Sequence, residues 1–183
     1  MAKTIQPTVI VLASGKGERF KASGGKVYKL KALLGGKPVL EHTLDAVKAS
    51  GLPWHLEDAG HPGMGDSIAA AVRATQHATG WLILPGDLPL IRGATLRELA
   101  LELANHAVVV PMYQGQRGHP VGFSKACGPA LMGLGGAEGA ASVLRAHPAA
   151  QFEVDDEGTI TDIDTLDALA AAEALWQARQ NGG

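Results

Sequence analysis

Short apolar runs alternate with amphipathic segments along the chain. Residues 8–12 and 81–84 are continuous runs of apolar and β-branched side chains, which is the pattern of strands buried on both faces of a parallel sheet. Residues 38–51 carry apolar side chains at helical spacing between an opening proline and a closing glycine, and residues 67–78 predict a second helix. This alternation predicts an α/β fold with three layers, a mostly parallel sheet covered by helices on both faces.

The second half of the chain continues with shorter elements. Thr95 and Glu98 match a capping box, and an apolar stripe over residues 96–103 follows. Beyond this helix the pattern predicts strands at 107–110 and 121–123, extended segments at 151–154 and 159–163 around an acidic turn, and a terminal helix at 166–179.

Other features concern packing and domain organisation. The glycine-rich residues 133–139 predict a surface loop, not a domain boundary. We expect Trp54 and Trp81 in the core and Trp176 in the packing of the last helix. Because there is no repeat and no low-complexity linker, we expect residues 1–183 to form one domain.

Composition narrows the class of protein. The chain has 183 residues, a net charge of -2, 46% apolar residues and 4% aromatic residues, so a sizeable core is expected but no surface for nucleic acid or membrane. Cys127 is the single cysteine and cannot form an internal disulfide. No apolar run approaches the ~18 residues of a membrane span, and the first residues do not resemble a signal peptide. These features predict a cytoplasmic protein.

The strongest local charge signal follows the first predicted strand. Between Ser14 and Lys31 there is one acidic side chain, Glu18, but there are six basic ones: Lys16, Arg19, Lys21, Lys26, Lys29 and Lys31. Glycines at 15 and 17 allow backbone N–H groups to approach an anion closely, so the loop is expected to bind phosphate. The spacing matches neither a dinucleotide-binding fingerprint nor a P-loop. A solvated basic loop without a ligand is the alternative interpretation.

Asp87 stands in an unusual place, directly after the buried run at 81–84. A carboxylate there must be paired, bound to a metal or exposed at a strand end, because an unpaired buried charge costs several kcal/mol or more. An aspartate after a strand is also a common turn former.

Six motifs occur in an order that covers nearly the whole chain. They are VLASGKGERF (11–20), KLKALLGGKPVLEHTLDAV (29–47), GMGDSIAAAV (63–72), LPGDLPLI (84–91), GQRGHPVGF (115–123) and DIDTLDAL (162–169). This set resembles the MobA-like nucleotidyltransferases, and within them the molybdenum cofactor cytidylyltransferases. The resemblance implies a glycosyltransferase A-like, Rossmann-like fold. It also implies Mg²⁺-dependent transfer of a nucleoside monophosphate, CMP being favoured, from an NTP to a phosphorylated small-molecule acceptor such as molybdopterin, with release of pyrophosphate.

The resemblance also implies roles for individual residues. Lys29 would act at the α-phosphate, with Lys26 as the alternative, and together with Arg19 and Asp87 would be catalytic. Asp87 and Asp164 would bind the metal, whereas the alternative for Asp164 is to cap the last helix with Thr165. His119 and Pro120 would face the acceptor. Nucleotide binding would involve Leu12, Ala13, Ser14, Gly15, Lys16, Gly17, Arg19, Lys29, Gly63, Met64, Gly65, Ser67, Pro85 and Gly86. For the turn at 63–67, an N-cap formed by Asp66 or Ser67 is equally compatible with the sequence.

Three departures from the family pattern keep alternatives open. Ser14 replaces the usual Ala or Gly, which leaves the choice of base open. Only about a dozen residues separate the first long helix from Gly63, where the family has a strand, a helix and a further strand, so we expect the fold to be reduced by one βα unit. Residues 136–141 (GAEGAA) lack the aspartate and the arginine of the usual acceptor loop. Arg117 or Arg145 would have to replace the lost arginine. The alternatives are a guanylyltransferase, a sugar-phosphate nucleotidylyltransferase, or a non-catalytic nucleotide-binding or regulatory homologue.

Overall fold

A seven-stranded sheet forms the centre of the molecule. The structure is a computed structural model that describes residues 6–14, 17–25 and 28–182. The strands run in the order β4-β1-β5-β8-β6-β7, and β9 pairs with β6. Their bounds are β1 (Thr8–Leu12), β4 (Trp54–Glu57), β5 (Gly80–Pro85), β6 (Val108–Tyr113), β7 (Gln116–Arg117), β8 (Val121–Ser124) and β9 (Ala150–Glu153). β1 is parallel to both β4 and β5, and β6 is parallel to β9, whereas β8 is antiparallel to β5 and β6, so the sheet is mostly parallel.

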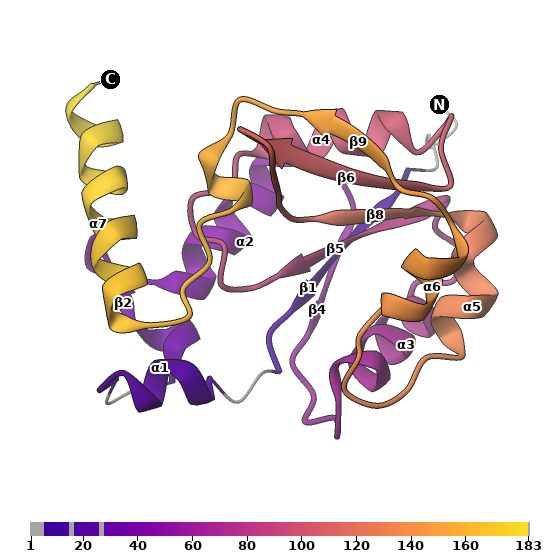
Figure 1. Cartoon of the computed structure of the whole chain (residues 1–183), viewed down its shortest axis with the longest axis horizontal. Helices are drawn as coiled ribbons and strands as arrows, with labels where there is room; N and C mark the ends of the chain where they lie inside the picture. Colours follow the sequence, from indigo (N-terminus) through magenta and orange to yellow (C-terminus); the bar gives the residue numbers. More distant parts are fainter. Residues whose placement is uncertain (1–5, 15–16, 26–27, 183) are drawn as a thin grey trace.

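Helices cover both faces of this sheet, as Figure 1 shows. On one face lie α2 (Val39–Ser50) and α4 (Gly93–Glu102), and on the other α3 (Met64–Ala74), α5 (Gly128–Met132) and α6 (Ala141–Ala146). The predicted three-layer α/β architecture is therefore confirmed. The remaining elements are α1 (Glu18–Ala22), η1 (Lys29–Lys31), β2 (Leu33–Leu34), β3 (Lys37–Pro38), η2 (Lys125–Cys127), η3 (Glu157–Thr159) and α7 (Leu166–Asn181).

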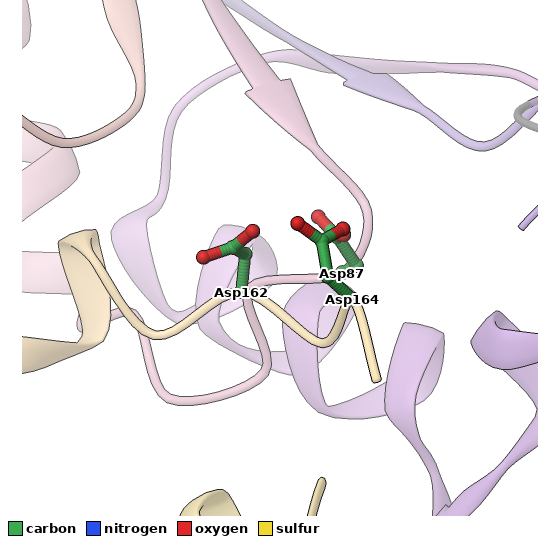
Figure 2. A group of neighbouring side chains, drawn as sticks. All are labelled: Asp87, Asp162 and Asp164. Carbon is green, nitrogen blue, oxygen red and sulfur yellow. The ribbon is translucent and has the colours of Figure 1, made fainter. Parts of the chain in front are cut away.

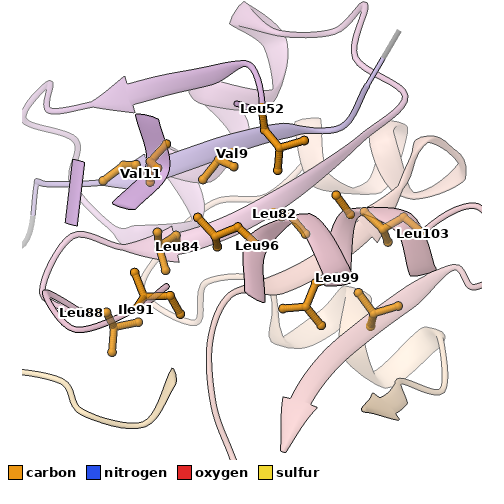
Figure 3. Packing of buried hydrophobic residues seen from close by; sticks show 13 residues of the cluster. Val9, Val11, Leu52, Leu82, Leu84, Leu88, Ile91, Leu96, Leu99 and Leu103 are labelled. Carbon is orange, nitrogen blue, oxygen red and sulfur yellow. The ribbon is translucent and has the colours of Figure 1, made fainter. Parts of the chain in front are cut away.

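Two apolar layers hold the helices to the sheet. Strand residues alternate between them: Val9 and Val11 of β1 contact the α2–α4 layer, and Ile10 contacts the α3–α5 layer. Figure 3 shows the first layer, where Leu96 and Leu99 of α4 pack against the strands. Because the central strands are buried on both faces, their sequences are continuously apolar and not alternating.

A third apolar cluster lies at one side of the molecule, where α7 packs against β2. Trp176 of α7 covers Gly35 and stacks edge-on to His42, with ring centroids 6.2 Å apart. The expected helix-packing role of Trp176 is confirmed, and Trp81 is 1% exposed in the core as predicted.

The order of the first strands places a ligand site at β1. The chain passes from β1 through α2 to β4 on one side and returns through α3 to β5 on the other side of β1. In open α/β sheets, such a reversal of direction opens a crevice at the carboxyl ends of the strands, where ligands bind.

Several local predictions are wrong. Thr95 lies inside α4 and is not its N-cap, because its hydroxyl donates to Asp156 Oδ2 at 2.7 Å. Trp54 is 40% exposed because β4 is an edge strand, and Lys48 Nζ lies 5.7 Å from the centre of its ring. Residues 159–163 form no strand, and β9 pairs with β6 in parallel.

Other boundaries also differ from the expectation. α3 begins at Met64, before the predicted start at residue 67, and its N-cap is Gly63 without a side-chain hydrogen bond. The N-cap alternative for Asp66 and Ser67 is therefore wrong. Between α2 and Gly63 the described chain forms one strand, β4, and no helix. That the fold is reduced by one βα unit stays a prediction.

Candidate active site

A cleft of about 700 Å³ opens at the carboxyl ends of β1 and β5. Segments that are far apart in the sequence line it: the end of β1 and Gly17, residues 28–30, the turn before α3, the end of β5, the β6–β8 connection, and residues 159–164. The crevice that the strand order predicts therefore exists, and the six motifs converge on it.

Backbone contacts fix Asp87 at the floor of this cleft. Gly86 N donates to Leu12 O at 2.9 Å, and the hydroxyl of Thr43 in α2 donates to Gly86 O at 2.8 Å. A side chain at Gly86 would place its Cβ 3.0 Å from Leu12 O, which explains why glycine precedes the aspartate. Ile163 N donates to Asp87 O at 3.1 Å and so anchors the segment 162–164 beside the end of β5.

Three carboxylates meet at this point. Ligand oxygens of Asp87, Asp162 and Asp164 all lie within 4.8 Å of one another, and Figure 2 shows the three side chains gathered on two neighbouring loops. Asp87 is buried, and burial together with the neighbouring Asp164 carboxylate raises the pKa of Asp162 to about 6. The sequence prediction included Asp87 and Asp164 but missed Asp162. The repeated aspartate of the DIDT motif was the available signal.

Lys29 provides the opposite charge. Its Nζ donates to Asp87 Oδ2 at 2.7 Å and lies 3.5 Å from Asp164 Oδ1. Burial lowers the pKa of Lys29, but the attraction of Asp87 and Asp164 outweighs burial and the pKa is raised. Of the three possibilities for Asp87, the pairing with a cation is thus observed, and the ammonium group lies beside the acidic cluster.

The donor set of the cluster fits a hard divalent cation. Carboxylate oxygens are the ligands that Mg²⁺ and Mn²⁺ prefer, and Mg²⁺ sites at substrate phosphates commonly use one or two carboxylates. Thr165 caps α7 by accepting from Ala168 N at 3.1 Å, so the helix capping that the sequence offered as an alternative is observed for Thr165.

The first turn of α3, with its N-cap Gly63, forms one wall of the cleft next to the end of β1. Ser14 Oγ and Ser67 Oγ share a hydrogen bond of 3.0 Å, and Met64 is more than half exposed at the rim. The loop at 133–139 lies on the surface as predicted and supports this turn: Gly65 N donates to Gly136 O at 2.9 Å, and Gly136 N donates to Asp66 Oδ2 at 3.2 Å.

The opposite wall comes from the connection between β6 and β8. Gln116, Arg117, Gly118 and His119 line it. His119 N donates to Thr159 O at 2.9 Å, and a Cβ at Gly118 would lie 2.6 Å from the same oxygen. His119 is exposed at the cleft surface, yet the surrounding walls desolvate its ring and lower its pKa. The Asp87 carboxylate opposes this shift and Arg117 adds to it.

Most of the described candidates from the sequence line the cleft. These are Leu12, Ser14, Gly17, Lys29, Gly63, Met64, Ser67, Pro85, Gly86, Asp87, Asp164 and His119. Ala13, Gly65 and Pro120 do not line it. Gly15, Lys16 and the alternative Lys26 lie outside the described residues, as does the side chain of Arg19. The cleft residues that sequence reasoning missed include Tyr28, His61, Thr159 and Asp162.

The two arginines considered for the acceptor lie in different places. Arg117 lines the cleft, whereas Arg145 lies 3.5 Å from Glu138 in a pair whose side chains are both largely exposed. Arg117 is therefore the better placed of the two.

Comparisons with known proteins agree with this geometry. A model of the MobA-like NTP transferase domain matches residues 45–151, more than half of the chain. The protein has the α/β architecture and acidic cleft of a nucleotidyltransferase, and it belongs to the MobA-like NTP transferase family. The resemblance to the MobA-like family that the six motifs indicate is thereby confirmed. In the described part of the chain, no helix has the length and apolar character needed to cross a membrane.

The curated proteins that are similar in sequence include a longer, bifunctional one. The bifunctional protein GlmU of Desulfitobacterium hafniense (strain DSM 10664 / DCB-2) is 32% identical over 111 residues, which are 49% of this chain and 24% of GlmU. The chain thus spans about a quarter of the length of that curated relative.

Solved structures show the same fold. Rv0371c from Mycobacterium tuberculosis H37Rv has a TM-score of 0.78 and 23% identity, covering 94% of this chain and 99% of that one. Its complex with manganese has a TM-score of 0.73 and 22% identity, covering 92% and 98%. Molybdopterin-guanine dinucleotide biosynthesis protein A from Archaeoglobus fulgidus has a TM-score of 0.67 and 20% identity, covering 93% and 99%.

Proposed function

We propose that this protein is a Mg²⁺-dependent nucleotidyltransferase that moves a nucleoside monophosphate, CMP in preference, from an NTP to a phosphorylated small-molecule acceptor such as molybdopterin. The observation that carries the proposal is the convergence of Lys29 with three carboxylates at the end of β5, in a cleft of about 700 Å³. Family membership supports the reaction class, and the order of the six motifs favours the cytidylyl branch.

The reaction needs no nucleophile from the protein. An oxygen of the acceptor's phosphate attacks the α-phosphorus of the NTP, a new P–O bond forms, and the bond to the β-phosphate oxygen breaks. Pyrophosphate leaves with the electron pair of that bond, so atoms and charge balance between two substrates and two products. The protein contributes positioning and charge neutralisation, as in other phosphoryl-type transfers.

Asp87, Asp162 and Asp164 are the residues that would hold the metal, and the bound cation would supply charge neutralisation at the phosphates. Lys29 lies at the same cluster, so its ammonium group would neutralise charge that develops at the α-phosphate. In this proposal the loop with Gly15, Lys16, Gly17 and Arg19 holds the triphosphate.

In this proposal each wall of the cleft binds a different substrate. The N-cap and first turn of α3 (residues 63–67) and the end of β1 (Leu12, Ser14) would bind the nucleoside, while Pro85 and Gly86 shape the floor. On the opposite wall, Arg117 offers a fixed charge to the acceptor's phosphate, and His119 with its lowered pKa offers a neutral hydrogen-bonding ring.

A sugar-phosphate nucleotidylyltransferase is the second candidate, because residues 136–141 depart from the usual acceptor loop. A guanylyltransferase is a further alternative, because Ser14 occupies the position that bears on base choice. The intact acidic cluster and its lysine favour an enzyme over a non-catalytic homologue.

The decisive experiment measures pyrophosphate release with each of the four NTPs, with Mg²⁺ and with candidate phosphorylated acceptors. We predict that Asp87→Asn lowers turnover about 100-fold or more while the fold is retained, because one charged oxygen donor is lost at the cluster. Asp45→Asn is the matched control, since Asp45 pairs with Lys37 on the exposed surface and turnover should not change.

The outcomes separate the candidates. Wild-type-like turnover of Asp87→Asn would remove Asp87 from the metal site. If the wild-type protein binds NTPs but turns over none with any acceptor, the non-catalytic interpretation replaces the proposed one.

A further inference from the structure

A buried glutamate with two histidine partners lies beside the cleft, outside the acidic cluster. Glu57 is the last residue of β4 and is 7% exposed. His55 Nε2 donates to its Oε2 at 3.0 Å, and His61 Nε2 donates to its Oε1 at 2.9 Å. Burial raises the pKa of Glu57, but the two histidine hydrogen bonds outweigh it and the pKa is lowered. Glu57 is therefore a fixed anion that orients both rings.

The two histidines differ in what they face. His61 lines the cleft directly before the turn at Pro62 and Gly63, whereas His55 is not among the described residues that line it. One ring nitrogen of His61 is engaged by Glu57, so Nδ1 is the ring nitrogen left for a ligand. A histidine oriented by a buried carboxylate and exposed to a cleft has the arrangement of a ligand-contacting residue with its support.

The strand order shows which part of the cleft His61 occupies. Glu57 is paired with Leu12 at the end of β1, and Ala13 N donates to Glu57 O at 2.9 Å. β1 lies between β4 and β5, so the ends of β4 and β5 are two strand spacings apart, which is about 10 Å. His61 therefore lies on the side of the cleft away from Asp87 and also away from the wall formed by Arg117 and His119.

We propose that His61, held by Glu57, contacts the sugar or base of the bound nucleotide and contributes to its selection. The inference rests on the proposed nucleotidyltransferase function and adds a residue on the nucleoside side. Nδ1 accepts a hydrogen bond when the ring is neutral, and ribose hydroxyls and exocyclic amino groups are the donors that a nucleoside offers. Glu57 is a positioning residue in this arrangement, since it reaches the ligand through His61.

Binding measurements with two probes test the proposal. Isothermal titration with Mg²⁺ and the NTP that binds best is compared with titration of inorganic tripolyphosphate, which lacks sugar and base. We expect His61→Ala to weaken NTP binding about tenfold and to leave tripolyphosphate binding within about twofold, because one hydrogen bond to the nucleoside is lost. Glu57→Gln should shift the same NTP-to-tripolyphosphate ratio by a smaller factor, an effect that a merely structural role would not produce.

His106→Ala provides the matched control. His106 also lies near a glutamate four residues away in the sequence, with Nε2 3.9 Å from Glu102, but it precedes β6 at the opposite end of the sheet from the cleft. The His106→Ala variant should bind both the NTP and tripolyphosphate with the affinity of the wild type. His61→Gln, which keeps a hydrogen-bonding side chain, should recover part of the NTP affinity.

Two results would overturn the inference while leaving the proposed function in place: NTP affinity unchanged in His61→Ala, or an equal loss of NTP and tripolyphosphate affinity. A wild-type protein that binds none of the four NTPs would overturn the proposed function and the inference together.

Discussion

The contact between Lys29 and the acidic cluster leads to a quantitative prediction about stability. Lys29→Met removes an ammonium group that lies 2.7 Å from Asp87 and 3.5 Å from Asp164, while a side chain of similar length remains. Removing one partner of a buried ion pair typically costs about 3–5 kcal/mol, because the other charge stays behind without compensation. The Asp87 side chain is 9% exposed but that of Lys29 is 17% exposed, so we take the lower limit, about 3 kcal/mol.

This loss of stability is measurable as a decrease in the melting temperature. For a domain of this size, 1 kcal/mol corresponds to about 2–4 °C, so Lys29→Met should melt about 6–12 °C below the wild type in EDTA. Adding Mn²⁺ should raise the melting temperatures of both proteins and narrow the difference between them. A cation at 100 times its Kd contributes about 2.7 kcal/mol, and in the variant it meets carboxylates that no ammonium group neutralises. The variant should therefore gain more from Mn²⁺ than the wild type.

Lys37→Met is the control for this experiment. Lys37 pairs with Asp45 where the two side chains are 40% and 57% exposed, and such surface pairs contribute about 1 kcal/mol at most. If Lys29→Met melts within about 2 °C of the wild type in EDTA, or if the control falls as far, the reasoning about charge compensation at the cluster is refuted.

Two further predictions concern stability. Glu57→Gln should flatten the acid limb of the stability curve. The pKa of Glu57 is lowered from 4.5 in the folded state, so the ionised carboxylate stabilises the fold above pH 4.5. This stabilisation is lost as the pH falls through the lower, folded-state pKa. Chemical denaturation between about pH 3 and 6 measures the free energy of unfolding across this range. Gly35→Ala should cost about 3 kcal/mol, because φ is +57° and a Cβ would lie 2.5 Å from Trp176. Gly36→Ala, with φ +81° and no atom within 4 Å, should cost only about 1 kcal/mol; equal losses would refute the packing argument.

The parts of the fold that local patterns determine could be predicted from the sequence. β1 and β5 are buried on both faces and are continuously apolar, and α2 has a proline before it and a left-handed glycine, Gly51, after it. Thr95 shows where such patterns fail. Its hydroxyl bonds the distant Asp156, so a tertiary contact replaces the local capping interaction that the sequence suggested.

In the site, too, local sequence signals could be predicted but tertiary contacts could not. Asp87 could be identified because a carboxylate follows a buried strand, and Lys29 and Asp164 because they lie in family motifs. Asp162 was missed because two aspartates separated by one residue are not in themselves a signal of a metal site. Only the long-range hydrogen bond from Ile163 N to Asp87 O places both flanking carboxylates beside β5. His61 has no ligand spacing in the sequence and gains its orientation from Glu57 only in the folded chain.

Asp156 explains how the acidic segment reaches the cleft. Its buried carboxylate accepts from the hydroxyl of Thr95 in α4 and, at 2.9 Å, from Gly158 N, so it joins the loop after β9 to the start of α4. At Gly158 a Cβ would lie 2.1 Å from Leu90 O, which means that the loop packs against the chain that follows β5. What the sequence suggested as a turn between two strands is therefore a junction. The family model matches residues 45–151, which include Asp87 but not Asp162 and Asp164. The acidic cluster therefore depends on packing between the matched segment and the C-terminal part of the chain.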